Sequence, residues 1–195
     1  MSPSFSSRNK RVTRRTLLAQ RDALNETERA EKSQKIAEAA DALLAQHVEP
    51  GAVVALFAAK GSEVATAAID AAARTRGLTV TYPRVIGDGQ PLAFHPARLD
   101  ELVPAGFGLR EPAADMPAIE LGAIAVFFVP GLAFDRAGGR VGWGRGHYDA
   151  TLAAAPSALR VGLAYDFQLV DGVPREPHDT PMHVILTEVA TYTVA

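Results

Sequence analysis

The sequence predicts an α/β fold in which helices cover a mainly parallel β-sheet. Segments with apolar residues at the helical period alternate with short runs of β-branched and aromatic residues, and this alternation is typical of parallel sheets. Several runs are apolar at consecutive positions, as expected for strands buried on both faces. The 195 residues contain no repeat and no linker, so we expect a single domain spanning residues 1–195.

The N-terminal part is predicted to form two helices. A basic helix is expected from about residue 8 to residue 24. Asn25 should interrupt it, because an Asn side chain followed by Glu28 three positions later can cap the start of a new helix. The second helix should extend to about Gln46, with an apolar stripe along one side.

The remaining elements follow from hydrophobic runs and the Gly and Pro residues that flank them. Strands are predicted at residues 52–57, 78–82, 124–129, 159–165 and 184–187, and helices at residues 64–76 and 147–155. Residues 83–121 are rich in Pro and Gly, with short strands expected near residues 92–94 and 101–103. We expect that region to fold over one edge or the mouth of the sheet.

The segment from Gly138 to Asp149 is the strongest functional signal, because glycines alternate there with bulky or basic residues ahead of a predicted helix. Glycine allows the backbone to approach an anion, and the start of a helix offers unpaired N–H groups. Arg140 and Arg145 add forked donors, and Asp149 could hold a magnesium ion. The spacing matches neither of the two common phosphate-binding patterns, so the predicted anion site rests on these residue types.

Composition excludes several classes of function. The chain has 48% hydrophobic and 22% charged residues and a net charge of −2, so it offers no general attraction to nucleic acid or to an anionic membrane. The absence of cysteine excludes thiolate catalysis and cysteine-ligated zinc. The longest stretch without polar side chains, residues 121–134, is too short for a bilayer span. We expect a cytoplasmic protein, with a monomer as the favoured state.

Several single residues allow two interpretations. Trp143 could stack on a planar ring or anchor its loop by packing. Lys10 and Arg14 lie four apart and could reach one polyanion together, or form a solvated basic face. Asp179 could share a cation with Asp149 or serve as a turn residue.

Other polar residues follow predicted strands. Glu63 could cap the helix after the first strand or face a pocket. Ligands of open parallel sheets bind beyond the carboxyl ends of the strands. The segment from Gly138 to Asp149, which we call the glycine loop, could therefore converge on one pocket with residues 58–63 and residues 165–166. His178 and His183 lack a zinc-binding spacing, and we interpret both as structural or surface groups.

Seven short motifs occur in order along the chain: Lys10-x-x-x-Arg14, Glu63-Val64-Ala65-Thr66, Pro83-Arg84, Phe107-Gly108-Leu109-Arg110-Glu111-Pro112, Val129-Pro130-Gly131-Leu132-Ala133-Phe134-Asp135, the glycine loop ending in Tyr148-Asp149, and Glu176-Pro177-His178-Asp179. Together they span nearly the whole chain and resemble the 5-formyltetrahydrofolate cyclo-ligase family, also called methenyltetrahydrofolate synthetase. Each motif alone is weak, whereas the ordered set is highly specific.

The resemblance implies a three-layer α/β/α fold with a mainly parallel sheet, similar to the sugar-phosphate isomerase and CoA-transferase-like group. It implies an enzyme that uses ATP and Mg²⁺ to close 5-formyltetrahydrofolate to 5,10-methenyltetrahydrofolate, with release of ADP and phosphate. The formyl oxygen would be phosphorylated and N10 would then attack the activated carbon. Such a reaction needs positioning and charge neutralisation more than a protein nucleophile.

The resemblance also implies which residues bind each ligand. ATP would contact Lys10, Arg14, Arg140, Val141, Gly142, Trp143, Gly144, Arg145, Gly146, His147 and Tyr148. Folate would contact Ala58, Glu63, Trp143, Gly144, Arg145, Gly146 and His147, and magnesium would be held by Asp149 and Asp179. The catalytic, charge-stabilising role of Arg145 is our own inference, because that position varies in the family between glycine and basic residues.

Two departures from the family pattern leave alternatives open. His147 stands where a first tyrosine is usual, and residues 58–62 differ from the usual residues before the glutamate. One alternative is a non-catalytic regulator of one-carbon metabolism that binds folate or nucleotide. Another is a sugar-phosphate isomerase, which would need no ATP. Because Lys10 and Arg14 would be functional, we do not expect the Ser- and Arg-rich N-terminal segment to be a cleaved transit peptide.

Overall fold

A computed structural model describes residues 5–177 and 179–194, with side chains from residue 11 onward. The helices are α1 (Phe5–Ala23), α2 (Glu26–His47), α3 (Ala67–Thr75) and α4 (His147–Ala153). The strands are β1 (Val53–Ala55), β2 (Thr79–Arg84), β3 (Ala93–Pro96), β4 (Val103–Pro104), β5 (Arg110–Glu111), β6 (Ile124–Pro130), β7 (Ala133–Asp135), β8 (Arg140–Val141), β9 (Leu159–Leu163), β10 (Leu169–Val170), β11 (Val184–Leu186) and β12 (Thr191–Thr193).

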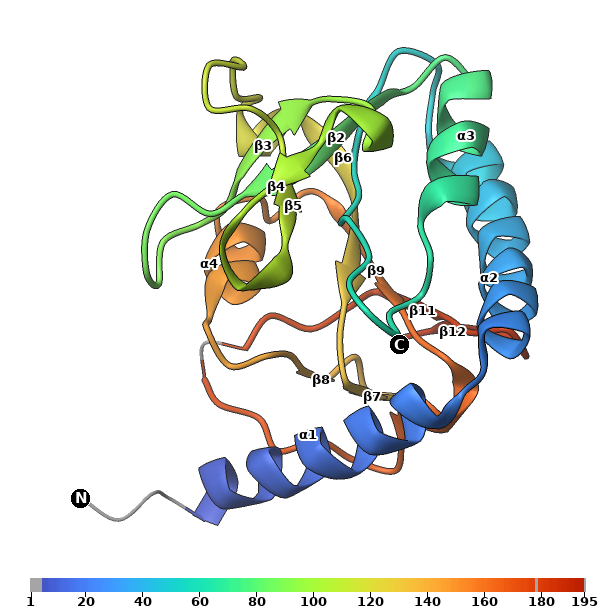
Figure 1. Cartoon of the computed structure of the whole chain (residues 1–195), viewed down its shortest axis with the longest axis vertical. Coiled ribbons are helices and arrows are strands. Elements are labelled where there is room, and N and C mark those ends of the chain that lie inside the picture. Colours follow the sequence, from blue (N-terminus) through green and yellow to red (C-terminus); the bar gives the residue numbers. More distant parts are fainter. Residues whose placement is uncertain (1–4, 178, 195) are drawn as a thin grey trace.

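The centre of the fold is a seven-stranded sheet in the order β12-β11-β9-β6-β1-β2-β3. Its five inner strands are parallel, and the edge strands β3 and β12 are antiparallel. Helices α2 and α3 cover one face and α4 the other (Figure 1). The predicted three-layer α/β/α fold with a mainly parallel sheet is confirmed.

The core divides between the two faces because strand side chains alternate. In β6, Val126 and Phe128 pack beneath α2 and α3, whereas Phe127 and Val129 pack on the side of α4. A register shift where β6 pairs with β1 precedes this alternation. All four side chains are buried, so β6 is packed on both of its faces.

The two N-terminal helices meet as predicted at Asn25. Its side chain accepts a hydrogen bond from the Glu28 backbone N–H, and the Glu28 carboxylate accepts one from the Asn25 N–H, each at 2.9 Å. This capping box starts α2. Helix α1 crosses one end of the molecule (Figure 1), where buried Arg21 donates to the Ser62 hydroxyl at 3.0 Å.

A second small sheet, β10-β7-β8, lies beside α1. Its strands of two or three residues are too short for a periodic signal, and the sequence did not predict them. The strand expected at residues 101–103 is partly wrong. Leu99–Glu101 forms a 3-10 turn because the Glu101 carboxylate caps the Arg98 N–H at 2.8 Å, and β4 begins only at Val103. Among the described residues, no helix is long and apolar enough to cross a membrane.

Candidate active site

A cavity of about 970 Å³ opens at the carboxyl ends of the parallel strands. Phe57 and Ala58 follow β1, Pro83 lies near the end of β2, and Pro130 ends β6. The predicted binding residues that line it are Arg14, Ala58, Glu63, Arg140, Val141, Gly142, Trp143, Gly144, Arg145, Gly146, His147, Tyr148, Asp149 and Asp179. The structure therefore brings together every predicted site residue whose side chain it describes, and the side chain of Lys10 lies outside that part.

Residues 165–166 do not join this cavity. The Asp166 carboxylate accepts hydrogen bonds from the Thr187 hydroxyl at 3.2 Å and from the Tyr192 hydroxyl at 3.1 Å. It therefore links the segment after β9 to the last two strands. The expectation that this segment reaches the pocket is wrong, because the turn after Leu163 carries the chain toward the β11–β12 edge.

The glycine loop is clamped by α1. The Arg14 Nε donates to the Gly142 carbonyl at 2.7 Å. Gly144 has φ +88°, and a Cβ there would lie 3.0 Å from the Arg14 guanidinium. A side chain at position 144 would be strained by the left-handed backbone and would press on the Arg14 guanidinium, so glycine suits this position. The clamp holds a guanidinium against the loop at the wall of the cavity.

The side chain of Arg140 also lies close to the loop, since a Cβ at Gly142 would lie 2.5 Å from its guanidinium, and it is deeply buried. Its guanidinium pairs with the Asp149 carboxylate at 2.9 Å, and only 6% of the Arg140 side chain is exposed. The Nε of Arg140 is buried without a hydrogen-bond partner among the described residues. A buried donor without a hydrogen bond costs free energy, so this wall is suited to an acceptor supplied by a ligand.

His147 and Tyr148 continue the same wall. The His147 Nδ1 donates to the Gln90 carbonyl at 3.0 Å, because a carbonyl can only accept. That leaves the buried Nε2 of His147 and the buried Tyr148 hydroxyl without partners among the described residues. Burial, and after it the Glu63 carboxylate, raises the pKa of Tyr148. Its phenol therefore stays neutral and can donate at any working pH.

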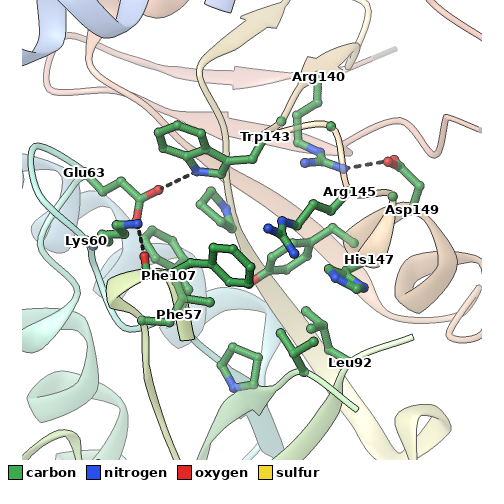
Figure 2. A pocket seen from close by; sticks show the side chains of 18 of the residues that line it. Phe57, Lys60, Glu63, Leu92, Phe107, Arg140, Trp143, Arg145, His147 and Asp149 are labelled. Atoms are coloured by element: carbon green, nitrogen blue, oxygen red, sulfur yellow. Dashed lines mark hydrogen bonds and ion pairs between the residues drawn. The ribbon is translucent and has the colours of Figure 1, made fainter. Parts of the chain in front are cut away.

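Glu63 faces the cavity and does not cap α3, whose N-cap residue is Thr66. The Glu63 carboxylate accepts a hydrogen bond from the Lys60 backbone N–H at 3.0 Å. It also accepts one from the Trp143 indole N–H at 3.2 Å (Figure 2). Trp143 keeps half of its surface exposed. It is thus anchored at its nitrogen while half of its surface stays open to the cavity, and stacking on a planar ring stays a prediction.

Arg145, the predicted catalytic residue, contacts Phe107 across the cavity. Its guanidinium lies 3.9 Å from the centre of the Phe107 ring, a cation–π contact (Figure 2). Phe107 is 72% exposed and has φ +60°, and the Lys60 ammonium donates to its carbonyl. The sequence motifs include Phe107 but assign it no function, and they assign no function to Lys60. A bulky aromatic side chain between glycines was the signal for Phe107.

The two predicted magnesium ligands share a recess beside the cavity. Asp149 and Asp179 border this space of about 10 Å³ together with Arg140 and Arg175. One Asp179 oxygen accepts from the Glu176 N–H at 2.8 Å. These two carboxylates are the groups here that could hold Mg²⁺, which takes few protein ligands and completes its shell with water and phosphate, but Arg140 already pairs with Asp149. No group of three potential ligands is present among the described residues.

Of the two remaining histidine predictions, only the one for His183 can be assessed. His178 lies outside the described residues. His183 is structural as predicted, since its Nδ1 accepts from the Arg160 N–H at 3.2 Å. Burial and the Arg160 charge lower the pKa of His183 below its ordinary value.

Comparison with known proteins supports one family. The model of the 5-formyltetrahydrofolate cyclo-ligase family matches residues 6–188. A 5-formyltetrahydrofolate cyclo-ligase of Mycolicibacterium smegmatis is 36% identical over 189 residues, covering 94% of this chain and 95% of that protein. One from Escherichia coli is 35% identical over 113 residues, covering 56% of this chain and 61% of that protein.

Solved structures agree with that match. The 5,10-methenyltetrahydrofolate synthetase of Aquifex aeolicus aligns with a TM-score of 0.80 and 28% identity, covering 95% of this chain and 92% of that one. The synthetase of Mycoplasma pneumoniae aligns with a TM-score of 0.76 at 23% identity, covering 92% and 99%. This second likeness supports the fold alone.

Proposed function

This chain belongs to the 5-formyltetrahydrofolate cyclo-ligase family, and we propose that its 970 Å³ cavity carries out the family reaction. The reaction is the ATP-dependent closure of 5-formyltetrahydrofolate to 5,10-methenyltetrahydrofolate, with release of ADP and phosphate. A sugar-phosphate isomerase, the second alternative from the sequence, has no support in the family match.

One observation carries the placement of the ligands. Of the buried side-chain polar atoms without partners in the described residues, three lie on one wall of the cavity: Arg140 Nε, His147 Nε2 and the Tyr148 hydroxyl. Buried polar atoms are almost always satisfied in folded proteins. Three unmade hydrogen bonds on one wall therefore support a polar ligand at that wall.

We place the ATP phosphates along this wall. Arg140 and Arg14 both line the cavity and carry positive charge, and Lys10 lies one turn before Arg14 in α1. The neutral Tyr148 phenol adds a donor, and the loop from Arg140 to Tyr148 adds backbone groups. Forked guanidinium groups suit phosphate oxygens, so these residues account for nucleotide binding without either common phosphate-binding pattern.

Magnesium would be held by Asp149 and Asp179 at the edge of the same wall. When bound there, the ion would supply positive charge that neutralises the phosphates. Asp149 is paired with Arg140. With both ligands bound, the Asp149 carboxylate would also contact the ion, and the Arg140 guanidinium would also contact the nucleotide.

Folate is placed on the other side of the loop, between Trp143 and the segment after β1. The half-exposed Trp143 ring offers a stacking surface, and Glu63 is fixed by two hydrogen bonds so that its carboxylate faces the cavity. A buried carboxylate is the natural partner for the N–H donors of a pterin ring. Ala58 and the backbone from Gly144 to His147 complete this side.

The chemistry follows from the placement of the two ligands. The formyl oxygen attacks the γ-phosphorus, an O–P bond forms, and ADP leaves. N10 then attacks the activated formyl carbon and loses its proton, and the C–O bond breaks to release phosphate. Arg145 is the cation we assign to the transferred phosphoryl group, where developing charge needs a positioned donor. To reach it, the guanidinium must leave the Phe107 ring.

The test is product formation by purified protein with ATP, Mg²⁺ and 5-formyltetrahydrofolate, followed by the near-ultraviolet absorbance of the methenyl product. We expect absorbance to rise only when all three are present. Folded protein that binds ATP or folate in a calorimeter and forms no product would instead be the non-catalytic regulator.

A single domain, a monomeric state and a cytoplasmic location stay predictions. Sedimentation analysis would test the monomeric state.

A further inference from the structure

Asp135 ends β7 and is almost completely buried, with 4% of its surface exposed. Its Oδ1 accepts from the Gly139 N–H at 2.7 Å, the Ala137 N–H at 3.0 Å and the Arg175 guanidinium at 3.1 Å. Its Oδ2 accepts from the Val173 N–H at 2.9 Å. One carboxylate thus receives four donors from two segments that lie almost forty residues apart.

The first of these segments is the turn between β7 and β8. It leads directly to Arg140, which follows Gly139 and pairs with Asp149. Gly139 is packed so closely that a Cβ would lie 2.4 Å from the Val173 side chain and 2.7 Å from the Asp135 carboxylate. The turn and the second segment are therefore in direct contact around Asp135.

The second segment runs from Val173 to Met182 and carries Asp179. It is tied to the same turn at both ends, because the Met182 N–H donates to the Gly138 carbonyl at 2.8 Å. Arg175 adds a further bond to the Ala137 carbonyl. The recess bordered by Asp149 and Asp179 lies between the two tied segments.

We propose that Asp135 is a positioning residue that holds the Asp179 segment in register with the Arg140–Asp149 wall and so sets the affinity for Mg²⁺·ATP. The proposal rests on the proposed function, since it assigns the nucleotide to that wall. Asp135 itself does not line the cavity. It acts through the Val173 and Gly139 backbone. Folate is placed on the far side of the loop, so its affinity should not depend on Asp135.

The substitution Asp135→Asn cuts this link selectively. An amide has one acceptor oxygen and one donor nitrogen. The oxygen will take the Oδ1 position, where three donors converge, one of which is the positively charged Arg175 guanidinium. The amide nitrogen must then face the Val173 N–H, so two donors oppose each other and the Val173 bond is lost while the turn is kept.

The experiment compares two affinities in the full-length protein. Calorimetry measures binding of Mg²⁺ with a non-hydrolysable ATP analogue, and the fluorescence of Trp143, the single tryptophan, measures binding of 5-formyltetrahydrofolate. For Asp135→Asn we expect nucleotide affinity to fall by about tenfold, a size typical of lost outer-layer support at a metal site. Folate affinity should stay within about twofold of wild type, a change within the error of such comparisons.

Asp166→Asn is the matched control, because Asp166 also joins distant segments through its carboxylate but lies away from the cavity. It should change neither affinity. If Asp135→Asn fails to fold, Arg175→Lys replaces it, because lysine keeps the positive charge that borders the recess but does not reproduce the guanidinium bonds to the Asp135 carboxylate and the Ala137 carbonyl. This variant should weaken nucleotide binding less, and again without an effect on folate.

The wild-type titration separates the two claims. Wild-type protein that binds neither Mg²⁺·ATP nor its analogue overturns the proposed function and the role of Asp135 with it. Wild-type binding together with unchanged binding in Asp135→Asn overturns the role of Asp135 alone. Equal weakening of nucleotide and folate would also overturn it, because that outcome indicates a general loss of structure.

Discussion

The indole N–H of Trp143 donates to the carboxylate of Glu63 at 3.2 Å. This bond joins the glycine loop after β8 to the segment after β1, so two elements far apart in sequence form one side of the cavity (Figure 2). It gives Trp143 a fixed position although half of the side chain is exposed. The bond also keeps the Glu63 carboxylate turned toward the cavity.

Replacing Trp143 by Phe tests this relationship. The ring stays apolar and flat, but the hydrogen bond to the carboxylate is lost, and a bond to a charged group is worth about tenfold in affinity. We expect the KM for 5-formyltetrahydrofolate to rise by about that factor, with the KM for ATP almost unchanged. Steady-state kinetics with each substrate varied in turn measures both. An increase in the ATP value alone would contradict the placement of folate on this side.

Gly144→Ala should damage nucleotide binding through the backbone. The substitution places a Cβ at φ +88° and 3.0 Å from the Arg14 guanidinium, so the loop must shift away from its clamp. We expect the KM for ATP to rise severalfold while the chain stays folded. Gly122→Ala is the matched control, since a Cβ there meets nothing within 4 Å. Equal kinetics for the two variants would show that the clamp is unimportant.

The prediction from sequence succeeded where the signal is local. Strand β6 is apolar at nearly every position, and Asn25 and Glu28 form a capping box three residues apart, so both could be located without a structure. The loop from Gly138 to Asp149 was singled out because glycine, arginine and carboxylate types cluster there, whereas Lys10, Ala58 and Glu63 were assigned through the family resemblance. Their pairing was not predictable. The Arg14 bond to Gly142 spans 128 residues, and no local pattern encodes it.

Arg140→Lys tests the forked donor on the wall. Lysine keeps the charge and can still pair with Asp149, but it cannot present two parallel N–H groups to a phosphate. We expect kcat/KM for ATP to fall by at least about tenfold, with a smaller effect on folate. Arg76→Lys controls for the chemistry of the change, because Arg76 holds Asp41 with two bonds on the surface. Its kinetics should equal wild type, and Arg140→Lys kinetics at the wild-type level would refute the role of Arg140.

His183 should make stability depend on pH. Burial and Arg160 hold its folded pKa below the ordinary value of 6.5. Between those two values the unfolded chain binds a proton that the folded chain does not. The stabilising contribution is therefore complete above about pH 6.5 and is lost as the pH falls toward the folded pKa.

Urea unfolding of wild type and His183→Gln from about pH 7.5 to pH 5 measures this contribution. We expect the free energy of unfolding to decline less steeply with falling pH in the variant. Parallel curves would mean that the folded pKa of His183 is not lowered. The comparison isolates His183 because the other histidines are the same in both proteins.

The departures from regular patterns were the hardest to predict. Phe107 adopts φ +60° although it is not glycine, and its position is set by Lys60 and Arg145 from two other segments. Asp135 was visible only as the end of a motif. Its four donors come from the turn that follows and from residues 173–175, a convergence that exists only after the sheets have assembled.

The central claim is that one cavity couples ATP cleavage to closure of the folate ring. The most direct measurement is the ratio of ADP released to methenyl product formed when purified protein is mixed with a limiting amount of ATP, Mg²⁺ and excess 5-formyltetrahydrofolate. We expect equal amounts of the two products and no methenyl product without ATP. Methenyl product formed without ATP, or ADP released without ring closure, would contradict it.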